Sequence, residues 1–434
     1  MKMTDIYEIA EYALKALKNC GADAAQCIVG RSKKDELNVD GGKFSLMRST
    51  FNTSISMKAI KDGKKGVTSI NQATKEAIDE AATQCIAAAE SSVPDEAEQI
   101  APFTAKAEYK TGVFEPDLDK LFDRIEEFMS QTKKEYPKVI LEQLISDYEH
   151  SEKLYMNTNG TSLRYEHGEY SFNTMFSAHE GEKASSFNGY FCALDNLDKP
   201  FMDAGMQRQL LEESEKQLNT VSPSEKFVGK VIYSPDCFNE LLQTALENFA
   251  SSGVLIDGTS PWKDALNTKI ASEKLSLRSV PLDDKTVVGQ RFTSDGYPAE
   301  NMDIIVDGVL KTFILSQYGA NKTGFPRALN GGNNLEVLPG DKTLEEIISG
   351  IDRGLIVNRF SGGQPSSNGD FSGVAKNSFL IENGKVSSAV SETMISGNII
   401  DMLNNIVAIS KEQTTDGLSF MPWAEFDGVT VSGK

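Results

Sequence analysis

The 434-residue sequence lacks three features that would place it in common functional classes. Lys and Arg number 44 against 63 Asp and Glu, which gives a formal net charge of −19. Phosphate backbones are bound by clustered Lys and Arg, so this excess of acid argues against a nucleic-acid partner. No apolar run approaches the roughly 18 residues of a membrane-spanning helix, so we expect no membrane partner. The pairs Gly331-Gly332 and Gly362-Gly363 lack the GxGxxG or GKS context of a phosphate-binding loop, which argues against nucleotide binding.

Cysteine is also sparse. The five cysteines are an odd number, without CxxC spacing, and we interpret them as reduced thiols rather than a disulfide framework. The first 21 residues carry Asp5, Glu8 and Glu11 among periodic apolar positions, which predicts an amphipathic helix and not a signal peptide. We therefore expect a cytoplasmic protein.

Histidine occurs three times, at His150, His167 and His179. Their spacings of 17 and 12 residues match no helical two-histidine motif, and no carboxylate or thiolate partner is evident for a metal site. We interpret them as surface or strand-edge residues, although folding could gather them. The sequence thus predicts no metal ligands.

The length favours two domains. Residues 1–220 alternate helical and strand patterns, with residues from about 90 to 112 expected as a surface connection. Residues 221–434 are rich in turn signals and predict a β-rich half, with strands such as Met302–Val306 and Lys311–Leu315. Helices beside hairpins, without regular βαβ alternation, indicate the α+β class.

One helix, predicted over 235–251, has a strong pattern. Ser234 suits the N-cap, Pro235 the first helical position, and Gly253 could end the segment. Apolar residues recur at three- and four-residue steps and predict a core-facing side: Phe238, Leu241, Leu242, Ala245 and Phe249. On its other side, Glu240 and Glu247 are seven residues apart, which fits a solvated stripe better than an acid/base pair.

Several blocks in order along the chain resemble the TldD/PmbA family, whose members were once described as modulators of DNA gyrase. The most specific is NGDFSGVA…FLIENGK…SETMISGN, and another is the ending MPWAEFDGVTVSG. The resemblance implies paired subunits. One, the TldD type, holds zinc through an HExxxH helix and a cysteine near the C-terminus; the other, the PmbA or TldE type, lacks these ligands.

In this sequence Gln243, Thr244 and Asn248 occupy the HExxxH positions, and the last cysteine is Cys237. Amides are poor zinc ligands, and a threonine cannot act as a carboxylate base. The resemblance therefore implies a non-catalytic subunit of a zinc metallopeptidase. It would process peptides or unfolded proteins with a TldD-type partner that supplies the zinc, or it would form a homodimer. The gyrase label is not extended to DNA binding, because the charge balance opposes it.

The loop at Asn368, Gly369, Asp370 and Ser372 is the candidate substrate-binding segment, since Gly permits close backbone approach and the polar side chains can bond an extended peptide. Ser372 as a nucleophile is a weaker alternative, because the flanking pattern of a nucleophile elbow is missing.

Two other function classes stay open: a self-associating peptide-binding protein without a peptidase partner, and a hydrolase with an unrecognised metal-free site. The apolar segment 392–409 fits either a dimer interface or this chain's own core.

Overall fold

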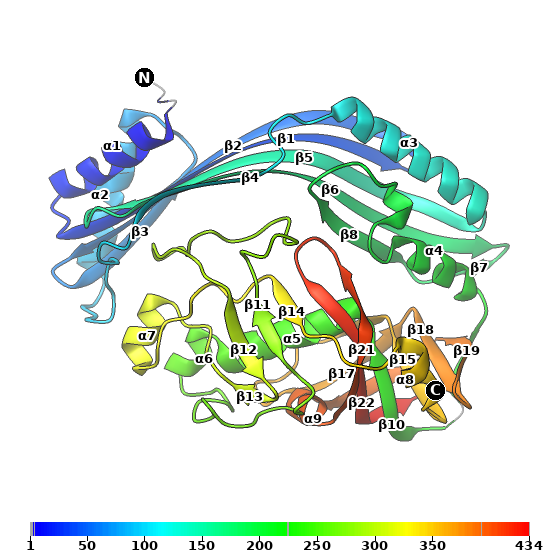
Figure 1. Ribbon diagram of the computed structural model, residues 1–434. Coiled ribbons are helices and arrows are strands. Elements are labelled where there is room, and N and C mark those ends of the chain that lie inside the picture. Colours follow the sequence, from blue (N-terminus) through cyan, green and yellow to red (C-terminus); the bar gives the residue numbers. More distant parts are fainter. Residues whose placement is uncertain (1–2, 4, 224, 392, 434) are drawn as a thin grey trace.

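A computed structural model describes residues 3, 5–223, 225–391 and 393–433. A long, curved sheet from the first half of the chain arches over a second, strand-rich half (Figure 1). Helices lie against both sheets without regular βαβ alternation. The predicted α+β class, with a helix-and-sheet half followed by a β-rich half, is confirmed.

The described residues of the first half form an eight-stranded sheet of order β3-β2-β1-β5-β6-β4, with β7 and β8 also paired to β6. Neighbouring strands are antiparallel except for the parallel pair β4 and β6. The strands are β1 Ala24–Asp40, β2 Lys43–Lys61, β3 Lys64–Ile70, β4 Lys106–Gly112, β5 Val139–Asn157, β6 Ser162–Glu180, β7 Lys183–Ala184 and β8 Asn188–Leu194.

Helices cover the convex face of this sheet at its two ends (Figure 1). Helices α1 (Ile6–Asn19) and α2 (Lys75–Ser91) pack on one end, and α3 (Leu118–Glu135) packs on the other. Each begins at a side-chain N-cap, Asp5, Thr74 or Asp117, which satisfies a free backbone N–H of the first turn. The short helix η1 (Phe201–Asp203) and α4 (Gln207–Lys216) lead into the second half.

The second half contains a sheet of fourteen described strands built around β22 and β10. Its strands are β9 Thr220–Val221, β10 Phe227–Tyr233, β11 Leu277–Ser279, β12 Met302–Val306, β13 Val309–Leu310, β14 Leu335–Val337, β15 Arg353–Val357, β16 Arg359–Gly362, β17 Asp370–Lys376, β18 Ser378–Glu382, β19 Lys385–Val390, β20 Met394–Asn398, β21 Ile406–Thr415 and β22 Phe420–Ser432. Its helices are α5 Pro235–Ala250, α6 Ser252–Ile256, α7 Gln317–Thr323, α8 Leu344–Ser349 and α9 Ile399–Asn404.

Helix α5 forms as its sequence predicts, and its five predicted apolar residues are all buried in the core of the second half. Two details differ. The hydroxyl of Ser234 donates to the carbonyl of Asn358 instead of capping the helix. Ser251, in an extended conformation, ends α5, and Gly253 lies inside the next helix.

Two other predictions are wrong. The segment 90–112 does not run freely over the surface, because its end forms β4 in the sheet, and Ile100 and Ala101 are buried. Residues 311–315 form no regular strand: Ile314 makes one isolated bridge, to Ser251. Period-two patterning fits any extended segment, whether or not a partner strand lies beside it.

The apolar segment 392–409 chiefly fills this chain's own core. Its buried members are Ile395, Ile399, Met402, Leu403, Ile406, Ala408 and Ile409. Met394 is 38% exposed. Glu392, one of the segment's charged residues, lies outside the described residues.

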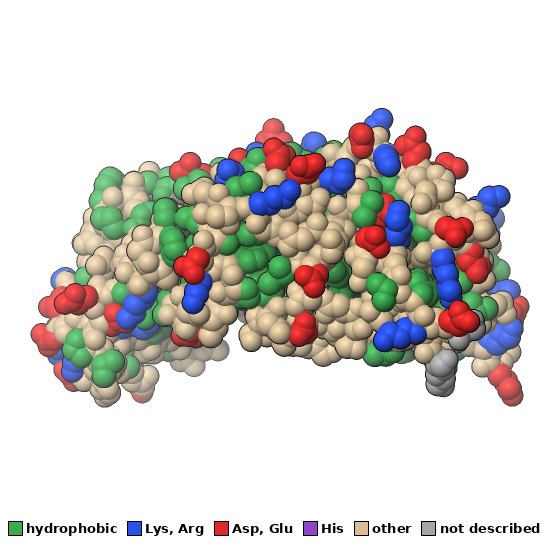
Figure 2. Space-filling view, turned by 90° about the horizontal axis from the view of Figure 1, so that it is seen from below, with side chains coloured by type: hydrophobic (Ala, Val, Ile, Leu, Met, Phe, Trp, Pro, Cys, Tyr) green, Lys and Arg blue, Asp and Glu red, His purple; other side chains and the backbone are tan. Residues whose placement is uncertain are grey.

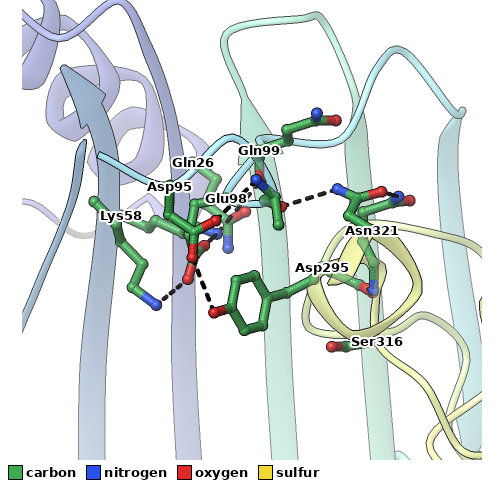
Figure 3. Close-up of polar contacts among 12 residues, drawn as sticks. Gln26, Lys58, Asp95, Glu98, Gln99, Asp295, Ser316 and Asn321 are labelled. Atoms are coloured by element: carbon green, nitrogen blue, oxygen red, sulfur yellow. Dashed lines mark hydrogen bonds and ion pairs between the residues drawn. The ribbon is translucent and has the colours of Figure 1, made fainter. Parts of the chain in front are cut away.

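The two halves touch at both ends of the long sheet. At one end, residues of both halves share a hydrophobic core, to which the second half contributes Ile232, Ile356 and Trp423. Toward the other end, Phe292 packs with Tyr155 and Leu163. Polar contacts are added there (Figure 3): Tyr318 Oη donates to Asp95 Oδ2 at 3.0 Å, and Asn321 Nδ2 donates to the carbonyl of Ala97 at 2.9 Å. The space between these two contacts holds the candidate site. Whether 220/221 marks a domain boundary stays a prediction.

Candidate functional site

Two cavities lie between the halves and meet at helix α5. The first, of about 680 Å³, lies between β6, β8 and the start of α5. The second, of about 740 Å³, lies between β1, β5 and the loops at 288–292 and 333–334. Asn239, Gln243 and Asp416 line both. The two cavities therefore adjoin each other beneath the concave face of the long sheet, and we call the pair the channel.

Small polar side chains form the sheet side of the second cavity, namely Ser32, Asn52, Ser54 and Ser151 beside Gly30. Alternation along the strands places them on the channel face, while Val29 and Leu154 point the other way, into the core under α1 and α2. A Cβ on Gly30 would lie 2.7 Å from Ser54 Oγ, so this position has no room for a larger residue. The small residues leave space above the sheet.

The tip of the β21–β22 hairpin stands where the cavities meet. Its backbone is fixed to the first half, since the amide of Ala193 donates to the carbonyl of Asp416 at 2.8 Å and Tyr190 Oη donates to that of Thr415 at 3.0 Å. The Asp416 carboxylate accepts from the amides of Leu418 and Ser419. The tip is therefore a rigid part of the channel wall.

Helix α5 presents a polar stripe to the channel, formed by Asp236, Asn239 and Gln243 at helical spacing. Gln243 Nε2 donates to Asn239 Oδ1 at 3.4 Å. Asp236 is reached by solvent, yet protein surrounds it on most sides. Burial, and then the charges of Asp416 and Glu240, raise its pKa to about 6. Burial also raises the pKa of Glu240.

The charges divide the channel into two unlike parts. The first cavity is lined by three carboxylates, Asp236, Glu240 and Asp416, against one guanidinium, Arg359; we call it the acidic cavity. In the second cavity, strand alternation turns Arg31 and Glu152 toward α1 and away from the cavity, so the charged side chains that line it are two cations, Lys153 and Arg291, and one carboxylate, Asp416; we call it the basic cavity.

The residues at the HExxxH positions do not fit zinc. Gln243 offers an amide to the channel, and the Thr244 hydroxyl donates to the carbonyl of Glu240 at 2.8 Å, within the helix. Asn248 offers a second amide. Among the described residues no three His, Cys, Asp or Glu side chains lie close enough together to hold a metal ion. Catalytic zinc needs three ligands of the imidazole, thiolate or carboxylate type, and these side chains do not supply them.

His150 and His167 are at adjacent positions of the β5–β6 pairing, His179 lies near the end of β6, and each of the three is beside a carboxylate. His150 Nε2 is 3.0 Å from Glu166, and His179 Nε2 is 3.9 Å from Glu142. These two are partly exposed, as expected, but His167 is buried because it sits on β6 between β4 and β5. Burial lowers the pKa of His167.

The loop predicted to bind substrate lies outside the channel. Asn398 Nδ2 donates to Asp370 Oδ1 and to the carbonyl of Asn368, each at 2.9 Å, so this loop braces the start of α9. Gly369 has φ +92°, and Ser372 pairs with Ser396 in the sheet. None of the four residues lines either cavity. Their role in substrate binding stays a prediction.

Sequence reasoning did not identify Lys153, Arg291, Asp236 or Asp416 as site residues. Each is an isolated charge in an ordinary segment, and only the fold brings the four to one channel. No local spacing marks them.

Comparison with known proteins supports the family suggested by the sequence. The profile described as PmbA/TldA metallopeptidase C-terminal domain matches residues 226–433, and that of PmbA/TldA metallopeptidase domain 1 matches residues 25–89. The chain belongs to the TldD/PmbA family. No described helix is both long and apolar enough to cross a membrane.

Among similar proteins are three metalloproteases. Metalloprotease PmbA of Escherichia coli O157:H7 is 32% identical over 35% of this chain and 34% of its own length. A zinc metalloprotease TldD homolog of Saccharolobus solfataricus is 29% identical over 47% of this chain and 49% of its own, and a metalloprotease of Methanocaldococcus jannaschii is 27% identical over 45% and 46%. Each match thus spans half or less of the relative.

Two solved structures share the fold along the whole chain. TldE from Thermococcus kodakarensis has a TM-score of 0.84 at 23% identity, covering 98% of this chain and 99% of its own. A protein from Bacteroides thetaiotaomicron described as a putative modulator of DNA gyrase has a TM-score of 0.83 at 24% identity, with full coverage of both chains. At these identities the likeness concerns the fold.

Proposed function

We propose that this TldD/PmbA-family protein is a non-catalytic subunit of the PmbA/TldE type, which helps a zinc-bearing TldD-type partner to bind and cleave peptides or unfolded proteins. The observation that carries the proposal is the set of neutral side chains, Gln243, Thr244 and Asn248, on the helix that borders the channel. The family's catalytic chemistry has no ligand set here, whereas a channel suited to a peptide is retained.

The channel would contribute by positioning. An extended peptide beneath the long sheet meets small polar side chains and backbone, which bind without regard to sequence. Holding a flexible chain in one orientation lowers the entropic cost of a later cleavage step. A cytoplasmic location belongs to the same proposal, supported by five free thiols.

Two surfaces support association. Residues 43–54 of β2 pair with β1 on one side, whereas β3 covers only 55–61 on the other, so this part of β2 is a free sheet edge among the described residues. On this edge the side chains of Met47 and Phe51 are 73% and 74% exposed. The face seen in Figure 2 carries few charged side chains near its middle, where hydrophobic ones gather. An interface on a chain of charge −19 needs such a surface, because buried like charges repel.

The test is reconstitution with an HExxxH-bearing TldD-type protein. We expect a heterodimer in light scattering, zinc in the partner alone, and cleavage of an unstructured peptide that is lost on chelation. Thr244→Ala should leave that cleavage nearly intact. Loss of cleavage in a correctly folded Thr244→Ala variant would contradict the non-catalytic assignment.

The same experiment separates the other two classes. A chain that dimerises and binds peptide, but neither joins nor activates the zinc-bearing protein, would be a self-associating peptide-binding protein. Cleavage by this chain alone after chelation would identify a metal-free hydrolase. A strictly monomeric chain under both conditions would contradict the subunit proposal.

A further inference from the structure

The basic cavity contains two cations without an anionic partner. Neither Lys153 nor Arg291 forms an ion pair with any described residue, although both line the same wall. One guanidinium nitrogen of Arg291 donates to the carbonyl of Pro281 at 3.2 Å, which anchors its side chain without neutralising it.

Aromatic residues bring these two cations together. Lys153 on β5 lies directly opposite Tyr165 on β6, and such cross-strand neighbours have Cβ atoms about 5 Å apart. The Arg291 guanidinium carbon lies 6.0 Å from the centre of the Tyr165 ring, and Lys153 Nζ lies 5.7 Å from that of Phe292. Both cations therefore flank Tyr165 on one side of the cavity.

The carboxylate of the basic cavity is already occupied. Asp416 accepts from two backbone amides of its own turn. Burial lowers the pKa of Lys153, which shows that its ammonium is poorly solvated without a compensating anion. An incoming anion would supply that compensation.

We propose that the basic cavity binds the C-terminal carboxylate of a peptide between Lys153 and Arg291, with the peptide chain running past Gln243 toward the acidic cavity. The proposal rests on the proposed function in that the ligand is a peptide. It adds the direction in which the peptide lies and the end that is recognised.

The channel favours a peptide over a small multivalent anion. The basic cavity adjoins the acidic one at Asn239, Gln243 and Asp416, so an occupant that extends past these residues approaches three carboxylates. A phosphate would gain the two cations but meet this negative field, whereas a peptide presents one carboxylate and then neutral backbone. The amide side chains of Gln290 and Asn333 add hydrogen-bonding groups at the same wall.

The test compares one fluorescently labelled, unstructured hexapeptide with a free C-terminus and the same peptide as its C-terminal amide, by fluorescence anisotropy with the full chain. The acid should bind about ten- to a hundredfold more tightly, the range for a charge-assisted hydrogen bond. Lys153→Gln and Arg291→Gln should each reduce that ratio toward one. Lys385→Gln, on an exposed residue outside both cavities, should leave it unchanged.

Further arms identify the source of the carboxylate. An amidated peptide with an internal Glu should bind like the plain amide, and inorganic phosphate should compete weakly. Equal binding of acid and amide, or an unchanged ratio in both variants, would overturn the proposal. Tight binding of phosphate or of the internal Glu would replace it with a general anion site.

These results can be told apart from failure of the proposed function. If acid and amide bind differently but no zinc-bearing partner is activated, the carboxylate site stands and the subunit assignment falls. If the reconstituted complex cleaves both peptides equally well, the subunit assignment stands and the carboxylate site falls.

Discussion

Leu242→Ala tests whether α5 is a structural element of the second half. Leu242 is 1% exposed within that core. The substitution removes three buried carbons, worth about 2.4 kcal/mol of transfer free energy at about 0.8 kcal/mol each. An incompletely collapsed cavity adds about 1–2 kcal/mol, so we expect a loss of about 3–4 kcal/mol in the free energy of unfolding.

The two tryptophans lie in different cores, so the fluorescence of one of them can report the stability of the core around α5. Trp262 packs against Phe249 of α5 with ring centroids 5.0 Å apart, whereas Trp423 belongs to the core that both halves share. In a Trp423→Phe background, urea unfolding followed by fluorescence reports the surroundings of α5. The midpoint should fall for Leu242→Ala.

Thr244→Ala is the matched control on the same helix. Its hydroxyl donates to the carbonyl of Glu240 within the helix, and alanine has the higher helix propensity, so stability should change by less than about 0.7 kcal/mol. A loss below about 1 kcal/mol for Leu242→Ala, or equal losses for the two variants, would refute the view that this helix is held by its buried face.

The remaining predictions concern charge, backbone and metal. Since the pKa of Asp236 is raised from 3.8 to about 6, the folded state holds a proton that the unfolded state releases, and stability falls as pH rises through that window. Asp236→Asn should therefore raise the free energy of unfolding above pH 6, by about 1 kcal/mol after allowance for solvent screening, and not at pH 3.5; Asp341→Asn, at an exposed position, is the matched control in urea unfolding. Gly296 has φ +91°, and a Cβ there would overlap the buried Tyr155 ring, so Gly296→Ala should cost about 1–3 kcal/mol more than Gly258→Ala, which has φ +68° and open space; equal losses in thermal unfolding would rule out the overlap. After dialysis against a weak chelator, elemental analysis should find far less than one zinc per chain. One tightly bound zinc per chain would contradict the interpretation that α5 carries no zinc ligands.

The sequence predicted those elements whose formation depends on residues close together in the chain. The apolar period of α5 was legible because the faces of a helix are set by residues three or four apart. The helix ends within one residue of the predicted range 235–251, but the residue that leaves the helical conformation is Ser251 and not Gly253. Whether 311–315 joins a sheet depends on distant partners, which the segment itself does not encode.

The channel could not be predicted for a related reason. Its charged lining comes from β5, α5, the 288–292 loop and a hairpin tip, more than 250 residues apart in places, for example from Lys153 to Asp416. The loop at Asn368–Ser372 was a reasonable candidate by composition, yet its polar groups bond to one another and to Asn398. Composition does not reveal whether a polar group has free bonding capacity.

The core shared by the two halves has a consequence for how this chain can be divided. Cutting near residue 221 would divide this core, which includes Phe172 and Leu210 on one fragment and Ile232, Ile356 and Trp423 on the other. Each fragment expressed alone should therefore aggregate, whereas co-expressed fragments should reassemble into a soluble, nicked protein, because each covers the other's apolar surface. That outcome would make the two halves complementary pieces of one folding unit, and a functional chimera would then need both halves taken from the same parent.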